Sequence, residues 1–364
     1  MQDRTRVRAE AERLTALFEE TGAVPFRTSI LQPAETLLDL YGEDIRARAY
    51  VTRDPSAGEM MLRPDFTAPL VQAHLAGRGG ITRYTYVGEV FRMQDGGGSG
   101  RPIEYLQVGL ELFPTDDPAA AEAEVFATIS RALQGLNLRA AMGDIGLLQA
   151  AVSGLSTSPA RRAALLRHLW RPRRFRALLE RFSGRTDTLE HRVKLLKKLE
   201  TASVSDVMAE AAPMIGIRSG AEIENRITAL KQDAQTPPIS PEEVALIDDL
   251  LAIQAAPADA LERLRDLAVD MPAIEPAVAC VSARFAALDA LDIDVSAALF
   301  EGSYGRTSLE YYDGFVFGFY AENRPDLSPV ATGGRYDALT RALGQEVAAV
   351  GGVIRPALVL EVQG

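Results

Sequence analysis

Two strand-like runs on either side of a glycine-rich stretch constrain the fold of this chain most strongly. Residues 83–94 (RYTYVGEVFRMQ) and 101–114 (RPIEYLQVGLELFP) are rich in aromatic and β-branched residues and alternate in polarity. The stretch between them, QDGGGSGRP at 94–102, does not match a phosphate-binding loop. We therefore predict a long antiparallel hairpin with a flexible connection.

A second run, residues 305–320 (GRTSLEYYDGFVFGFY), combines a strand pattern with an unusual polar lead-in. Three phenylalanines alternate with smaller residues, which predicts a half-buried strand. These are Phe315, Phe317 and Phe319. The polar residues just before them are Arg306, Thr307, Ser308 and Glu310. Two interpretations are open: the wall of a pocket for a small polar ligand, or a strand with a polar lead-in.

The order of the other elements predicts an α+β protein. Helices are expected at 5–21 and 118–136, and strands at 138–145, at 292–302 and over the closing stretch 348–362. Between about 153 and 276 the strand signals vanish and helical periodicity replaces them. We therefore predict a core formed by residues 1–152 and 277–364, with a helical insertion over 153–276.

Composition narrows the class of protein. Of the 364 residues, 47% are hydrophobic and 24% charged, as in ordinary globular proteins. The net charge of −11 argues against nucleic-acid binding by the whole surface. A single cysteine, Cys280, excludes an internal disulfide and fits a reducing compartment. Three histidines without ligand spacing predict no metal site. Neither a signal peptide nor a membrane span is indicated, so we expect a cytoplasmic protein.

One segment departs from this acidic balance. Residues 161–185 contain nine arginines and one acid, Glu180. The segment could bind a nucleic acid, a nucleotide or an acidic partner. Alternatively, it forms a solvated helix face whose arginine stems cover apolar surface. We favour the second interpretation, because only Trp170 and Phe175 are available for base stacking.

Eight polar or phenolic side chains occupy positions whose neighbours resemble a core. They are Asp65, Thr67, Arg92, Gln107, Glu111, Tyr311, Tyr312 and Tyr336. Asp65 and Thr67 share a face if LRPDFTAP is extended, and Gln107 and Glu111 share a strand face around Gly109. Singly, each is more often a surface residue. Together, the acids, the amide and the phenols could bind an ammonium group and a hydrogen-bonding ring.

The same segments resemble the catalytic core of class II aminoacyl-tRNA synthetases, specifically histidyl-tRNA synthetase. Residues 30–43 and 61–70 look like motif 1 and the histidine-binding loop, and the predicted hairpin looks like motif 2. LEYYDGFVF (309–317) and GGRYDAL (333–339) are similar to the two histidine-specific motifs. The resemblance covers about residues 5–145 and 285–358. It implies a class II synthetase-like, six-stranded antiparallel sheet flanked by helices, usually in a dimer.

Several positions depart from the synthetase pattern. Thr307 stands where the family has a catalytic arginine, and Arg306 would point to the opposite side of a strand. Ala357 and Leu358 stand where motif 3 has Glu-Arg, and Arg355 is not expected to substitute. Since a synthetase needs fixed positive charge at the phosphate transition state, activity is not expected. The sequence stops soon after motif 3, so no anticodon-binding domain is expected.

This combination resembles the histidyl-tRNA-synthetase-like regulatory subunits of ATP phosphoribosyltransferase, the first enzyme of histidine biosynthesis. The resemblance implies a non-catalytic subunit that activates a short catalytic subunit and mediates feedback inhibition by L-histidine. It implies a hetero-oligomer containing a self-dimer, with no tRNA or membrane partner. No cofactor is implied, and histidine is the allosteric ligand.

The resemblance also implies how the two polar ends of histidine are bound. Asp65, Thr67 and Gln107 would receive the ammonium group. Asp65 replaces the family's glutamate, which shortens its reach by about 1.5 Å. Arg92 would contact the carboxylate.

The ring would be bound by the second group of residues. Glu111 and Tyr312 would hydrogen-bond the imidazole nitrogens, Tyr336 would close the pocket, and Tyr311 lies beside them in the same motif. Two other classes remain open. One is a truncated synthetase-like ligase that activates histidine with ATP, which the intact Arg92 permits. The other is a dimeric scaffold that binds no ligand.

Overall fold

The computed structural model describes residues 4–34, 47–77, 82–93, 103–114, 117–211, 216–307 and 311–364. The predicted connection at 94–102, most of the motif 1 segment (35–43) and residues 308–310 of the polar lead-in lie outside these ranges. Within them, no helix is both long and apolar enough to cross a membrane.

A mixed sheet of nine strands forms the centre of the fold, and its order is β1-β5-β6-β12-β11-β10-β7-β9-β8. The six strands from β5 to β7 in this order are antiparallel to one another. They are β5 (Arg83–Phe91), β6 (Glu104–Leu112), β12 (Val350–Ile354), β11 (Ala331–Arg335), β10 (Phe315–Ala321) and β7 (Leu138–Asp144). The α+β class and the six-stranded antiparallel centre are therefore confirmed.

Short strands extend this sheet at both edges. β1 (Val24–Pro25) lies parallel to β5, and β9 (Leu299–Glu301) lies parallel to β7. β8 (Gln254–Ala255) pairs with β9 at the outer edge. A separate sheet contains β2 (Leu31–Pro33), β4 (Gly58–Leu62) and β3 (Val51–Asp54). The edges thus make the sheet mixed rather than purely antiparallel.

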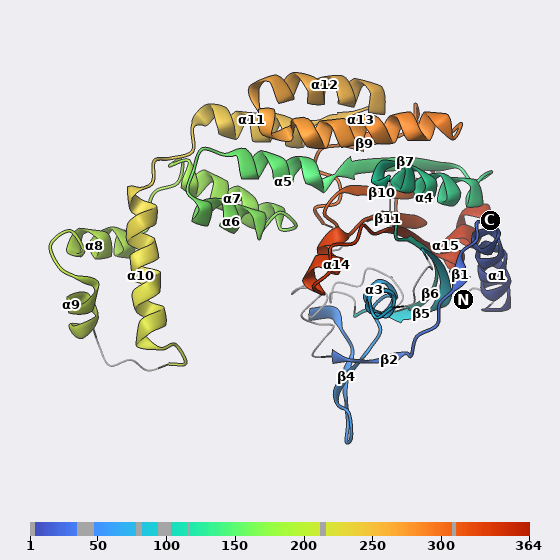
Figure 1. Cartoon of the computed structure of the whole chain (residues 1–364), viewed down its shortest axis with the longest axis horizontal. Helices are drawn as coiled ribbons and strands as arrows, with labels where there is room; N and C mark the ends of the chain where they lie inside the picture. Colours follow the sequence, from blue (N-terminus) through green and yellow to red (C-terminus); the bar gives the residue numbers. More distant parts are fainter. Residues whose placement is uncertain are drawn as a thin grey trace.

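Helices cover the sheet and also extend away from it (Figure 1). Those of the core are α1 (Arg4–Glu20), α3 (Thr67–Leu75), α4 (Pro118–Ala132), α13 (Glu275–Ala290), α14 (Asp337–Ala342) and α15 (Pro356–Gln363). The intervening helices are α5 (Ile145–Gly154), α6 (Pro159–Leu166), α7 (Pro172–Phe182), α8 (Glu190–Lys198), α9 (Val204–Ala209), α10 (Gly220–Gln235), α11 (Pro241–Ala252), α12 (Pro257–Asp270) and the 3₁₀ turn η1 (Pro272–Ile274). Helices α8–α10 project to one side of the molecule (Figure 1). The domain boundaries at 153 and 276 stay a prediction.

The predicted hairpin and the phenylalanine strand are both present. β5 and β6 pair antiparallel with Val87 opposite Val108. In β10, the rings of Phe315, Phe317 and Phe319 lie 6.2, 5.2 and 5.2 Å from that of Phe126 in α4. All residues of β10 except Tyr320 are buried, so the expectation of a half-buried strand was wrong. Helix α4 covers one face of β10, and the other face forms part of a cavity wall.

Three segments are less extended than the sequence pattern suggests. Within 292–302 only β9 is extended, because Asp292 adopts a φ of 57° and the Asp294 carboxylate accepts the Ser296 backbone N–H at 2.8 Å. The closing stretch becomes helical from Pro356, whose ring favours the first position of a helix. The segment around Asp65 is not extended, because Thr67 begins α3.

A buried ion cluster joins the two parts of the core. Arg284 of α13 is 1% exposed; its Nε donates to Glu122 of α4 at 2.6 Å and its Nη2 to Asp144 of β7 at 2.7 Å. Its guanidinium lies 4.3 Å from the ring centroid of Phe315. Arg335 of β11 donates to the other Glu122 oxygen at 3.2 Å. The cluster therefore fixes α4, α13 and the sheet against one another.

We expect Arg284→Met to lower the free energy of unfolding by about 3–5 kcal/mol, because buried Asp144 loses its cation and buried Glu122 keeps only Arg335. Urea denaturation followed by circular dichroism measures the loss. Arg263→Met, at an exposed position of α12, should change it by less than about 0.5 kcal/mol. Equal stability of the two variants would contradict the assigned role of Arg284.

Candidate functional site

A cavity of about 800 Å³ lies against β10, β11 and β12, and all eight predicted binding residues line it. They reach it from different parts of the chain: Asp65 precedes α3, Thr67 begins it, and Gln107 and Glu111 lie on β6. The remaining members are Arg92, Tyr311, Tyr312 and Tyr336. The structure thus brings together residues separated by up to 271 positions in the sequence.

Glu111 accepts three side-chain hydrogen bonds in the wall of the cavity. It is 2% exposed, and one of its oxygens accepts hydrogen bonds from Thr67 at 3.2 Å and Tyr86 at 3.1 Å. The other accepts from the Tyr336 hydroxyl at 2.6 Å. Burial raises the pKa of Glu111 to about 7, although the three hydroxyl donors oppose this shift. Glu111 can therefore change its charge near neutral pH.

Two glycines leave room for the hydrogen-bond network around Glu111. A Cβ atom at Gly351 of β12 would lie 1.5 Å from Oε2 of Glu111. At Gly109 of β6 it would lie 2.0 Å from Cζ of Tyr86, the residue opposite in the sheet register. The Tyr86 ring stacks on Phe66 at 4.3 Å between centroids. Glycine is required at these close approaches, so the sequence fixes where Glu111 points.

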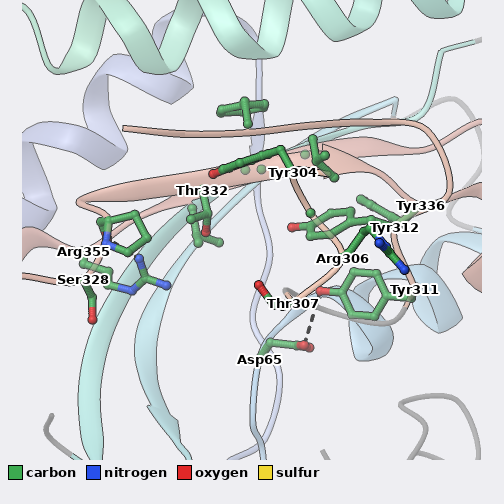
Figure 2. A pocket seen from close by; sticks show the side chains of 18 of the residues that line it. Asp65, Tyr304, Arg306, Thr307, Tyr311, Tyr312, Ser328, Thr332, Tyr336 and Arg355 are labelled. Carbon is green, nitrogen blue, oxygen red and sulfur yellow. Dashed lines mark hydrogen bonds between the residues drawn. The ribbon is translucent and has the colours of Figure 1, made fainter. Parts of the chain in front are cut away.

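Asp65 and Tyr311 face each other across the cavity (Figure 2). The Tyr311 hydroxyl donates to Asp65 at 3.5 Å, and the other Asp65 oxygen accepts the backbone N–H of Thr67 at 3.1 Å. Both side chains are buried. Asp65 is therefore oriented by the first turn of α3, rather than by an extended strand.

Gln107 is 1% exposed, and its Oε1 atom has no hydrogen-bond partner among the residues that the structure describes. Leaving a buried acceptor unpaired costs about 1–3 kcal/mol. Such an acceptor in a cavity wall can receive an N–H donor from a ligand. An ammonium group satisfies this requirement.

Arginines contribute positive charge to the wall. Arg92 donates through Nε to the Pro64 carbonyl at 2.8 Å, and Arg355 donates to the Pro329 carbonyl. In Figure 2, Arg355 and Ser328 lie at one end of the cavity and Tyr311, Tyr312 and Tyr336 at the other. Burial raises the pKa of Tyr312 well above its usual value, so the phenol stays protonated.

Residues 302–307 form a turn, so Arg306 and Thr307 do not lie on opposite faces of a strand as expected. Thr307 is exposed, whereas Arg306 is 6% exposed and donates through Nε to the Leu169 carbonyl at 2.9 Å. Its guanidinium lies 4.8 Å from the ring centroid of Phe175 in α7. Burial, together with Arg176, lowers the pKa of Arg306 to about 10.

Sequence reasoning missed three contributors. Tyr86 orients Glu111, and its position opposite Gly109 in the predicted hairpin was the available signal. Tyr304 and Tyr320 line the cavity and share a hydrogen bond of 2.9 Å between their hydroxyls. Tyr304 lies in the turn that precedes β10, where no periodic pattern indicates which way a side chain points.

The raised pKa of Glu111 makes folding stability depend on pH. The carboxyl group titrates near 4.5 when unfolded and near 7 when folded, so its stabilising contribution is present below pH 4.5 and lost as the pH rises through 7. The parent should therefore lose about 2.5 kcal/mol of stability between about pH 5 and about pH 8 through this group, and we expect Glu111→Gln to lack that loss. Urea unfolding across this range measures it. Glu104→Gln, at an exposed position of the same strand, should retain the parental pH dependence.

Comparison with known proteins identifies the family. Residues 2–236 and 223–357 match the family model described as histidyl-tRNA synthetase. The chain is 30% identical to the ATP phosphoribosyltransferase regulatory subunit of Mesorhizobium japonicum over 361 residues, covering 95% of each chain. It is 33% identical to the protein of that name from Agrobacterium fabrum over 346 residues, covering 89% of this chain and 88% of the relative.

Solved structures agree on the fold. An ATP phosphoribosyltransferase regulatory subunit/histidyl-tRNA synthetase from Bacillus halodurans aligns with a TM-score of 0.68 at 20% identity, covering 100% of this chain and 82% of the other. Histidyl-tRNA synthetase from Nostoc sp. aligns with a TM-score of 0.61 at 15% identity, covering 98% and 70%. With this fold and these relatives, the chain belongs to the histidyl-tRNA synthetase-like family of ATP phosphoribosyltransferase regulatory subunits.

Proposed function

We propose that this chain is a non-catalytic regulatory subunit of ATP phosphoribosyltransferase that binds L-histidine in the cavity around Glu111. One observation carries the proposal: the complete set of predicted histidine contacts lines a single cavity. At the two positions where a synthetase has its catalytic arginines, this chain has Thr307 and Leu358. The names of the relatives support a regulatory role beside a separate catalytic subunit.

The cavity offers a partner for each polar group of histidine. Asp65, Thr67 and Gln107 suit the ammonium group, since they present a carboxylate, a hydroxyl and an amide oxygen. The Glu111 carboxylate suits an imidazole N–H, with Tyr312 and Tyr336 beside it. Arg92 suits the carboxylate. Histidine therefore offers a group of opposite charge to both the acidic and the basic side chains of the wall.

Catalysis of aminoacyl transfer is disfavoured by the charges at the reacting end. Thr307 is neutral, and Arg306 beside it is held by the Leu169 carbonyl. Leu358, at the motif 3 arginine position, packs against the hydrophobic core. A phosphoryl-transfer transition state needs fixed cations aimed at the developing charge. Arg92 and Arg355 remain in the wall, which is why the ligase alternative is tested below.

Histidine should stabilise the chain by about 2.7 kcal/mol at 100 times its dissociation constant. We expect Gln107→Leu to weaken histidine binding by roughly 5- to 150-fold, because the ammonium group loses an acceptor. The unfolding free energy should not fall, since an unpaired buried acceptor is removed. Isothermal titration calorimetry measures affinity, with Gln232→Leu, at an exposed position of α10 outside the cavity lining, as the control. No binding to the parent would contradict the proposal.

Mixed with a short-form catalytic subunit, the chain should raise the rate of ATP and phosphoribosyl pyrophosphate condensation, and histidine should reverse the increase. The reason is linkage: if the partner and histidine favour different states, each changes the other's affinity equally, typically by about 5- to 150-fold. A coupled rate assay, with and without this chain, measures the effect.

Two outcomes favour the alternatives. Sustained histidine-dependent exchange of pyrophosphate into ATP by the chain alone would support the ligase. A catalytic subunit that is equally active without this chain, or activated but indifferent to histidine, would leave the scaffold interpretation.

A further inference from the structure

Charge is distributed unevenly along this chain. Residues 161–198 contain 13 basic and three acidic residues, whereas the rest of the sequence contains 26 basic and 47 acidic residues. A basic segment on an otherwise strongly acidic chain attracts acidic partners selectively, since the remaining surface repels them.

Part of this segment is structural. Arg161 is 7% exposed, pairs with Asp233 at 2.6 Å and donates to the Pro237 carbonyl at 2.8 Å. Arg176 pairs with Asp248 at 2.5 Å. These two arginines fix α6 and α7 to the neighbouring helices α10 and α11.

Several other arginines of the segment face solvent. Within the described ranges, five exposed members have no ion pair or side-chain hydrogen bond; these are Arg167, Arg173, Arg174, Arg181 and Arg185. Helix α7 buries Phe175, Leu179 and Phe182 along one side. At 100° per residue, Arg173 and Arg174 lie away from that apolar stripe. Together with exposed Arg181, they form the basic face of α7.

The same helix is attached to the cavity. Pro172, its first residue, lines the cavity wall together with Arg306. Arg306 packs on Phe175, one turn further along α7, and donates to the Leu169 carbonyl just before the helix. The turn that carries Tyr304 and Arg306 is therefore in direct contact with α7.

We propose that the basic face of α7 docks an acidic surface of the catalytic subunit, with Arg306 linking that contact to ligand binding in the cavity. The inference rests on the proposed function. A second copy of this chain also offers acidic surface, but a self-contact would not use the attachment of α7 to the cavity. An RNA partner is disfavoured, because Trp170 is partly buried and Phe175 is buried beneath Arg306.

The test compares two double charge reversals of equal size. Arg173→Glu with Arg174→Glu removes the basic face of α7, and Arg4→Glu with Arg6→Glu alters exposed residues of α1 at the far end of the molecule (Figure 1). Affinity for the catalytic subunit is measured by biolayer interferometry at low and high salt. We expect the α7 pair to weaken binding by about tenfold or more and to reduce its salt dependence, while the α1 pair behaves like the parent.

Further measurements separate the possible failures. Histidine affinity of the α7 variant should equal the parent's, which shows that the cavity is intact. A parent that binds and activates the catalytic subunit, together with an α7 variant that does so equally well, would overturn the docking face and leave the proposed function standing. A change of oligomeric state in light scattering with unchanged partner affinity would assign the face to self-association. Tight binding of a short single-stranded RNA, lost in the α7 variant while partner affinity stays unchanged, would assign it to RNA.

Discussion

The burial of Arg284 is the constraint on which the core of this molecule depends. Its two carboxylate partners precede the intervening helices in the sequence and Arg284 follows them, so the ion cluster closes a loop of 140 or more residues. Taking three charges out of water is costly, and directional hydrogen bonds offset that cost only in one arrangement. The two parts of the core are thereby held in one fixed arrangement. The same contacts fix the positions of β10, β11 and β12, which form the cavity wall.

The carboxylate of Glu111 is stabilised differently from those of the ion cluster. Burial raises its pKa, and the three hydroxyls that donate to it oppose that shift only in part. The charges of the ion cluster neutralise one another, whereas the Glu111 carboxylate in the cavity wall accepts hydrogen bonds from neutral hydroxyl groups. The difference between the two carboxylate environments separates scaffold from site more clearly than burial, which is nearly complete in both.

Much of the fold and most of the cavity wall could be predicted from the sequence, for physical reasons. Alternation fixed β5, β6 and β10, and the polar residues at core-like positions all reached one cavity. Errors arose where a local hydrogen bond or a proline overrides alternation, as at Asp294 and Pro356. Arg306 could not be placed, because its partners lie more than 130 residues earlier and no periodicity encodes such a contact.

The projecting helices α8 and α10 have no buried residue, and Leu199 and Val207 supply much of the apolar contact in that region. Burial of apolar area is what makes unfolding of a segment costly, so this unit can open at a free energy well below that of global unfolding. We therefore expect amide hydrogens there to exchange with solvent faster than those of the central sheet. Two separate stabilities are expected: that of a cooperative core that preserves the cavity, and a lower one of an arm that can open without disturbing it.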